Sequence, residues 1–175
     1  MPMFRLMLAG AAVLAISTQP LAAATAPTVA SISTLAQLQT PLPIPYDENA
    51  DANKEVDAAL AKARAEHKRA FIDLGGNWCG DCRVLAGLME LPEFKDFIAK
   101  YYVVAVVDVG RFNKNLQIPA RWGMVQALKD GGAPTVLIVD PLTNKVVDEG
   151  HTGALEDARH MSPQSIMDWI AQWAK

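Results

Sequence analysis

The two cysteines of the chain, Cys79 and Cys82, are separated by two residues, a spacing that suits reversible disulfide chemistry. Val84 to Met89 has helical apolar spacing, so the pair falls at the start of a predicted helix. Unsatisfied backbone N–H groups and the helix dipole stabilise a thiolate at such a position, where thiols have pKa values of about 3.5–7.5. Cys79 is therefore predicted to be the nucleophile, and Cys82, one turn further in, the thiol that resolves the mixed disulfide.

Two other uses of the cysteine pair stay open. A structural disulfide that closes so short a loop would contribute only about 2 kcal/mol in the chain-entropy model. Half of a zinc site would need ligands from a partner, because the chain has two cysteines and three histidines, without ligand-like spacing around the pair. Redox exchange without a metal or another cofactor is the favoured interpretation.

The composition is that of a soluble globular chain with little net charge. Of the 175 residues, 51% are hydrophobic and 20% are charged, and the formal net charge is −3. A domain of this size buries its own core, and we expect a monomer. No run of Lys or Arg marks a nucleic-acid surface, so no nucleic-acid partner is expected.

Residues 1–24 have the layout of a secretory signal peptide. Arg5 precedes an apolar run from Leu6 to Ile16, and small residues follow at a suitable cleavage position. The run is shorter than the ~20 residues that span a bilayer, although an uncleaved membrane anchor stays open. We therefore expect a periplasmic or secreted protein. Residues 25–45, rich in Ser, Thr, Ala and Pro, are predicted to be an extended linker before a domain at 46–175.

Apolar periodicity predicts that helices and strands alternate in this domain. The order ends strand, strand, helix, which implies an α/β fold with a central mixed sheet flanked by helices. The cysteines follow the first predicted strand, at the sheet edge where α/β proteins place their sites. The predicted helices are 47–68, 84–89, one from Pro92 and one from Pro163 capped by Ser162, and the predicted strands are 70–74, 102–109, 135–139 and 145–148.

Several spaced features of the domain resemble the thioredoxin superfamily. Trp78-Cys79-Gly80-Asp81-Cys82 is similar to the superfamily's Trp-Cys-Gly-Pro-Cys site, with Asp81 in place of the proline. Asp73, six residues before Cys79, matches its buried acid. Gly131-Gly132-Ala133-Pro134-Thr135 resembles its cis-proline loop, and Gly150-His151-Thr152-Gly153 resembles its glycine loop beside the substrate groove. The resemblance covers about Tyr46 to Lys175 and implies a thioredoxin-like fold in an exported bacterial oxidoreductase.

The resemblance also implies roles for these residues. Asp73 would pass protons, through water, to Cys82, although a satisfied strand carboxylate stays open as the alternative. Pro134 would form a cis bond that exposes the backbone of Ala133 to an extended substrate, unless it is an ordinary loop proline. The implied catalytic residues are Cys79, Cys82 and Asp73, and the implied substrate-binding residues are Trp78, Gly80, Asp81, Ala133, Pro134, Gly150 and His151.

Asp81 bears on the direction of exchange. A carboxylate near the Cys79 sulfur destabilises its thiolate, and hence the reduced form, which lowers the reduction potential. We therefore expect a protein-disulfide reductase that acts on disulfide-containing client proteins and is re-reduced by a membrane thiol donor. A disulfide oxidase or isomerase, and a thioredoxin-fold binding module without turnover, are the competing functions.

Two features depart from compact thioredoxins. Val104 stands where thioredoxin itself has a lysine near the buried acid, so Asp73 lacks that partner. Residues 111–132 form a longer segment than in those proteins. They are predicted to be either a partner-docking insert or a packed surface turn.

Overall fold

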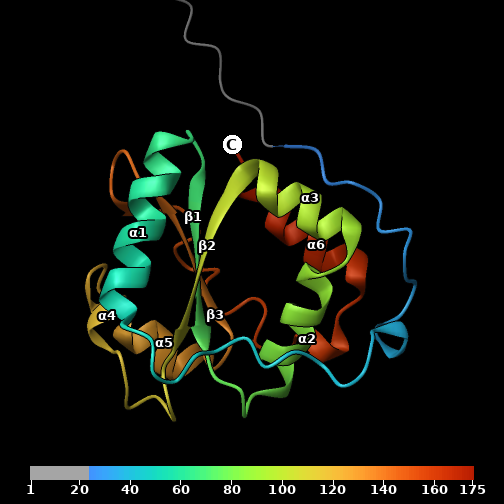
Figure 1. The fold of residues 1–175 in the computed structure, drawn as a ribbon, viewed down its shortest axis with the longest axis horizontal. Helices are drawn as coiled ribbons and strands as arrows, with labels where there is room; N and C mark the ends of the chain where they lie inside the picture. The colour runs from blue at the N-terminus through green and yellow to red at the C-terminus, as the bar shows by residue number, and fades with distance from the viewer. Residues whose placement is uncertain (1–23) are drawn as a thin grey trace, which may run out of the picture.

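A mixed sheet lies in the middle of the protein, in a computed structural model that describes residues 24–175 (Figure 1). Its strands are β1 (Arg69–Gly75), β2 (Tyr102–Asp108), β3 (Thr135–Asp140) and β4 (Lys145–Val146). The order across the sheet is β2-β1-β3-β4; β1 runs parallel to β2 and antiparallel to β3. This confirms the predicted fold class. The predicted signal peptide, apart from Ala24, lies outside the described residues.

Helices cover both faces of the sheet. They are α1 (Ala52–Ala65), α2 (Gly80–Met89), α3 (Pro92–Tyr101), α4 (Gln117–Ala120), α5 (Val125–Gly131) and α6 (Pro163–Gln172), with the short 3-10 helices η1 (Leu35–Gln37) and η2 (Ala158–His160). α1, α4 and α5 lie on one face and α2, α3 and α6 on the other (Figure 1), and each face buries its own apolar cluster. Within residues 24–175, no helix is long and apolar enough to cross a membrane.

The alternation of side chains along β1 decides which residues face the cysteines. Ile72 and Leu74 pack in the cluster with α1, whereas Phe71 packs in the cluster with α2, α3 and α6. Because successive side chains of a strand point to opposite faces, Asp73 lies on the same face as Phe71. The strand therefore directs its carboxylate toward the helix that carries the cysteines.

The helix ends follow local sequence signals. The Ser162 hydroxyl accepts the N–H of Ser165 at 3.0 Å and caps α6, as predicted. Pro92 opens α3 in the expected way. The first helix is shorter than predicted because the Asp51 side chain caps it, so α1 begins at Ala52 rather than at residue 47.

Residues 111–132 are a packed segment of the domain. Ile118 in α4 and Leu128 in α5 are fully buried in the cluster on the α1 side of the sheet. The Arg121 guanidinium pairs with Asp57 and donates to Asn53, both on α1. Of the two interpretations left open by the sequence, packing against the domain accounts for this segment.

Residues 24–45, named here the N-terminal strap, are extended but bound to the domain. The side chains of Ile32 and Leu38 are buried in the cluster with α2, α3 and α6. The carboxylate of Glu93 on α3 accepts the N–H and hydroxyl of Ser31, and the Arg83 guanidinium on α2 donates to carbonyl oxygens of the strap. Residues 25–45, predicted to be an extended linker, are thus extended but packed against the domain; apart from η1 they form no helix or strand, so their buried side chains give no periodic pattern in the sequence.

We expect Leu38→Ala to lower the free energy of unfolding by about 2–3 kcal/mol, since the substitution empties a buried position. Equilibrium urea unfolding measures the change. Ile44→Ala, in the same strap but 69% exposed, is the matched control and should cost less than about 0.5 kcal/mol. Equal small effects for the two variants would show that the strap is not packed in solution.

Candidate redox active site

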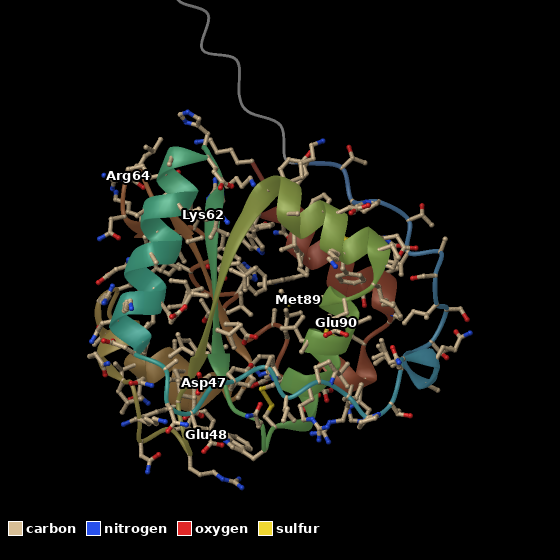
Figure 2. All side chains as sticks on the ribbon, in the orientation of Figure 1. Asp47, Glu48, Lys62, Arg64, Met89 and Glu90 are labelled. Carbon is tan, nitrogen blue, oxygen red and sulfur yellow. A yellow bond between two sulfur atoms is a disulfide. The ribbon has the colours of Figure 1, made fainter. Side chains whose placement is uncertain are left out.

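The two cysteines form a disulfide at the point where β1 ends and α2 begins. Their Cα atoms are 5.3 Å apart, and the bond is the yellow stick in Figure 2. Cys79 is the N-cap of α2, and the backbone N–H of Cys82 donates to the Cys79 sulfur at 3.1 Å. Cys79 is 5% exposed and Cys82 is fully buried, so Cys79 is the outer sulfur. The helix N-terminus therefore acts on the sulfur that a client can reach.

The loop before β3 faces the outer sulfur. The bond between Ala133 and Pro134 is cis, as predicted, and the Ala133 carbonyl oxygen lies 3.2 Å from the Cys79 sulfur. The backbone N–H of Val136 donates to the carbonyl of Thr152, which places the predicted glycine loop beside the start of β3. Gly153 approaches Gly131 closely, since a Cβ on Gly153 would lie 3.3 Å from the Gly131 Cα.

Asp73 is buried behind the disulfide, where the resemblance placed an acid. Its side chain is 2% exposed, and burial raises the pKa of the carboxyl from 3.8 to about 7. A hydrogen bond from the Tyr46 hydroxyl, 2.9 Å from Asp73 Oδ1, opposes that rise by stabilising the carboxylate. A carboxyl group with a pKa near neutrality can both accept and return a proton, which is the property that a general base needs.

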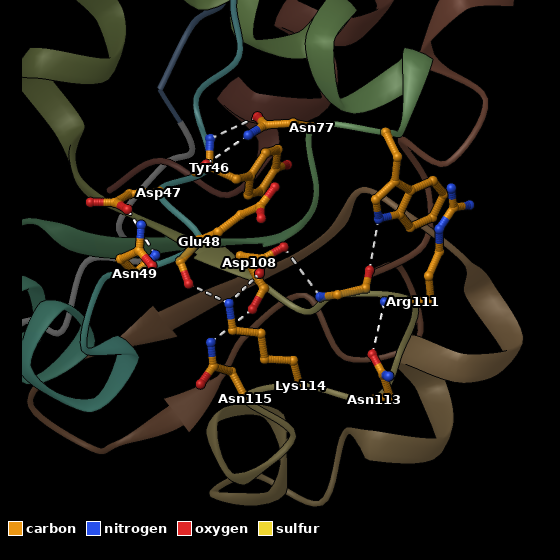
Figure 3. A network of polar contacts seen from close by, with 12 residues as sticks. Tyr46, Asp47, Glu48, Asn49, Asn77, Asp108, Arg111, Asn113, Lys114 and Asn115 are labelled. Carbon is orange, nitrogen blue, oxygen red and sulfur yellow. Dashed lines mark hydrogen bonds and ion pairs between the residues drawn. The ribbon is translucent and has the colours of Figure 1, made fainter.

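Tyr46 is one of two residues of the site that the sequence did not indicate. A Cβ on Gly75 would lie 2.7 Å from the Cys82 sulfur and even closer to the Tyr46 hydroxyl, so both atoms border the space over the glycine. The Asn77 side chain accepts the Tyr46 N–H at 3.1 Å and donates to the Tyr46 carbonyl at 2.7 Å (Figure 3). Tyr46 directly follows the strap, and no spacing in the sequence connects it with Asp73.

Asp81 differs from its expected role. Its side chain is 3% exposed and forms an ion pair with Arg159, with the Arg159 Nη2 at 2.7 Å from Oδ2. Oδ1 accepts both the backbone N–H of Arg159 at 2.9 Å and its Nε at 3.1 Å. The charge of the Asp81 carboxylate is therefore balanced by the Arg159 guanidinium, which comes from η2. The same guanidinium lies over Gly80. Because Arg159 offsets the charge of this carboxylate, the lowering of the reduction potential by Asp81 stays a prediction.

Trp78 lies at the rim of the site. Its side chain is 41% exposed, and its indole Nε1 donates to the carbonyl of Gly110 at 2.7 Å. The Arg111 guanidinium lies 4.4 Å from the centre of the indole ring, within cation–π range, and Phe112 contacts the ring edge-on. These contacts hold the partly exposed indole in place beside Cys79, and its role in substrate binding stays a prediction.

His151 and Gly150 belong to the predicted glycine loop. The imidazole of His151 is exposed and lies 5.5 Å, centre to centre, from the ring of Trp173 after α6. Gly150 has φ +84°, a conformation that favours glycine. Their role in substrate binding stays a prediction.

The structure therefore brings most of the predicted site residues together. Cys79, Cys82, Asp73 and the Ala133–Pro134 bond surround one point at the carboxyl end of β1. The two additions are Tyr46 and Arg159. Both reach the site from segments far away in the sequence, and a Tyr or Arg in such a segment gives no signal of its own.

A disulfide at a helix start, a facing cis-proline and a helix-flanked mixed sheet define a disulfide-exchange protein of the thioredoxin type. The family model described as thioredoxin-like matches residues 51–141, and the chain belongs to the thioredoxin-like family.

Two similar proteins agree with this assignment. The crystal structure of a disulphide isomerase from Xylella fastidiosa Temecula1 superposes with a TM-score of 0.66 at 37% identity, covering 74% of this chain and 96% of that one. A thioredoxin H-type of Chlamydomonas reinhardtii is 42% identical over 40 residues, which is 23% of this chain. That match spans 35% of the relative's own length. The findings support thiol–disulfide oxidoreductase chemistry in general.

We expect Asp73→Asn to stabilise the oxidised protein above pH 7. Because the folded state holds the pKa of Asp73 near 7 and the unfolded chain near 3.8, wild type loses stability as the pH rises between these values. The variant lacks this loss, so its advantage should grow by more than about 1.4 kcal/mol between pH 4 and pH 8. Urea unfolding at both pH values measures it. Asp96→Asn, at an exposed position of α3, should show no such growth; a constant difference for Asp73→Asn would argue against the shifted pKa.

We expect the Asp81–Arg159 ion pair to balance the reduction potential of the disulfide. Arg159→Gln leaves an unpaired carboxylate beside Cys79 and should lower the potential by roughly 15–30 mV, since 30 mV corresponds to about 1.4 kcal/mol. Asp81→Asn leaves the cation and should raise it by a similar amount. Equilibration with glutathione measures both, and the double variant, which should return near wild type, is the control. Shifts of the same sign in the two single variants would contradict a charge effect.

Proposed function

We propose that the protein is a thiol–disulfide oxidoreductase that reduces disulfides in client proteins. The observation that supports this most strongly is the Cys79–Cys82 disulfide, with its outer sulfur at the start of α2 and against the Ala133 carbonyl. The backbone around Pro134 offers an edge along which an extended client segment can pair. Trp78 supplies an apolar rim beside it.

The exchange takes place in two steps. The Cys79 thiolate attacks one sulfur of a client disulfide, the client S–S bond breaks, and its other sulfur leaves as a thiolate that takes a proton from solvent. Cys82 then loses its proton toward Asp73 and attacks the Cys79 sulfur. The mixed disulfide breaks, the second client thiolate leaves, and Cys79 and Cys82 are joined again. Two electrons have passed to the client, so a thiol donor must reduce the protein before the next cycle.

The direction of exchange has a second candidate. The similar Xylella fastidiosa protein is described as a disulphide isomerase, which favours isomerisation as the alternative to net reduction. An isomerase uses the same first step but lets the client thiol, rather than Cys82, resolve the mixed disulfide. The buried acid behind Cys82 favours the reductase, because it assists the step that an isomerase does not need.

We also propose that the protein works in the periplasm. The support is the signal-like sequence of residues 1–24. Disulfides persist in that compartment, so a reductase there has substrates but needs electrons from the cytoplasmic side. A membrane thiol donor would meet this need.

We expect Cys82→Ser to accumulate covalently joined to its clients, because the nucleophile of the second step is gone. With the N-terminal segment intact, the variant should appear as higher-mass adducts that collapse on adding dithiothreitol. Cys79→Ser is the matched control and should give few adducts, since its remaining thiol is buried. Mass spectrometry of the adducts would identify both the clients and the donor.

Two outcomes of this experiment count against the proposal. If Cys82→Ser forms no reducible adducts although it is made and exported like wild type, exchange with clients is wrong. If wild type itself accumulates as many adducts as Cys82→Ser, Cys82 does not resolve them, and the isomerase replaces the reductase.

A further inference from the structure

The hydroxyl of Tyr46 is bound to the buried acid and lies in the same packed region as the inner sulfur. It donates to Asp73 at 2.9 Å, and it borders, together with the Cys82 sulfur, the space over Gly75, where no side chain would fit. Tyr46 is 2% exposed and packs in one cluster with both cysteines. We propose that Tyr46 is a positioning residue of the second exchange step, whose hydroxyl holds the Asp73 carboxylate and connects it with Cys82. The inference rests on the proposed function, since it concerns the resolving thiol of that reaction.

The proton transfer that this arrangement permits is balanced. The thiol of Cys82 gives its proton to the Tyr46 oxygen while Tyr46 passes its own proton to the Asp73 carboxylate. The hydroxyl is restored, Asp73 becomes a neutral acid, and the Cys82 thiolate is free to attack. Burial, together with the neighbouring Asp73, raises the pKa of Tyr46, so the tyrosine itself stays protonated and serves as a link rather than a base.

The strap holds Tyr46 firmly in this place. Asn77 bonds both the N–H and the carbonyl of Tyr46, and Arg83 on α2 donates to the carbonyls of Leu42 at 2.6 Å and Pro43 at 3.0 Å. Backbone anchors on the segment therefore tie it to the turn before Cys79 and to the helix that carries Cys82. A side chain fixed at both the backbone and the hydroxyl can keep one orientation through the reaction.

The surroundings of Asp73 leave Tyr46 as its polar partner. Tyr46 packs in one cluster with the two cysteines at the start of α2, and from β2 the residue paired with Asp73 is the apolar Val106. From β3 the paired residue is Val136. The other acid that acts on Tyr46 is Asp108 at the end of β2, whose carboxylate is paired with Lys114 at 2.7 Å (Figure 3). Among the described residues, the Tyr46 hydroxyl is the side-chain hydrogen-bond donor to Asp73.

Tyr46→Phe removes only the hydroxyl and tests the proposal directly. In the oxidised protein, ¹³C NMR of the labelled Asp73 carboxyl should show a pKa about one unit higher than in wild type, because a hydrogen bond to the carboxylate is lost. When the reduced variant reacts with a model client, the client should be released from the mixed disulfide about tenfold more slowly than from wild type at pH 7. The release rate should recover as the pH rises toward 9. The matched control is Tyr102→Phe, which loses another buried hydroxyl contact, to the Ile170 carbonyl at 2.6 Å, and should change neither readout.

Two further variants make the result decisive. With Asp73→Asn already present, Tyr46→Phe should have no further effect on the pH profile of release. Asn77→Ala keeps the hydroxyl but frees the backbone of Tyr46, and should raise the pKa of Asp73 in the same direction; this measurement also serves if Tyr46→Phe does not fold. An Asp73 titration identical in wild type, Tyr46→Phe and Asn77→Ala would overturn the proposal. This NMR result needs no client, so it is separate from the failure of wild type to exchange disulfides, which would instead refute the proposed function.

Discussion

Burial of the Asp73 carboxyl behind a sulfur pair is the costly feature around which the site is arranged. Taking an ionised carboxylate out of water is unfavourable unless it is paired, and the neutral form is then preferred. The protein provides Asp73 with a neutral hydroxyl rather than a cation, which leaves its pKa near 7. The other buried acid near the cysteines, Asp81, has a cation as its partner, because it forms an ion pair with Arg159. One carboxyl can therefore exchange a proton near neutral pH, while the other serves to balance charge.

The partners of the two buried carboxyls come from segments near opposite ends of the chain. The strap delivers Tyr46 to the inner sulfur, and η2 delivers Arg159 to the start of α2. In Figure 1 the strap passes along the side of α3 and α6 and then crosses the end of the sheet toward α1. The apolar contacts of Ile32 and Leu38 thus do more than stabilise the fold, because they fix the path that leads to Tyr46.

The surroundings of Cys79 explain why the outer sulfur can react while the inner one is protected. Cys79 lies at the N-terminus of α2, with the Ala133 carbonyl on one side and the Trp78 indole at the rim. Cys82, by contrast, is enclosed by Gly75 and Tyr46. The glycine is required there, since any Cβ would collide with both partners. This asymmetry supports the ordered two-step exchange that we propose for this member of the thioredoxin-like family.

The sequence by itself determined the features that local patterns encode: the strand before the cysteines, the helix that begins at them, the caps at Pro92 and Ser162, and the α/β order. Spaced motifs then indicated Asp73 and Pro134. Only the tertiary structure decided the partners of the two carboxyls, because Tyr46 and Arg159 reach the site across 27 and 78 residues of chain. It also decided that residues 25–45 are bound, since an extended segment shows no periodicity from which buried contacts could be inferred. Local sequence patterns indicate secondary structure, whereas contacts between distant segments depend on how the helices pack on the sheet.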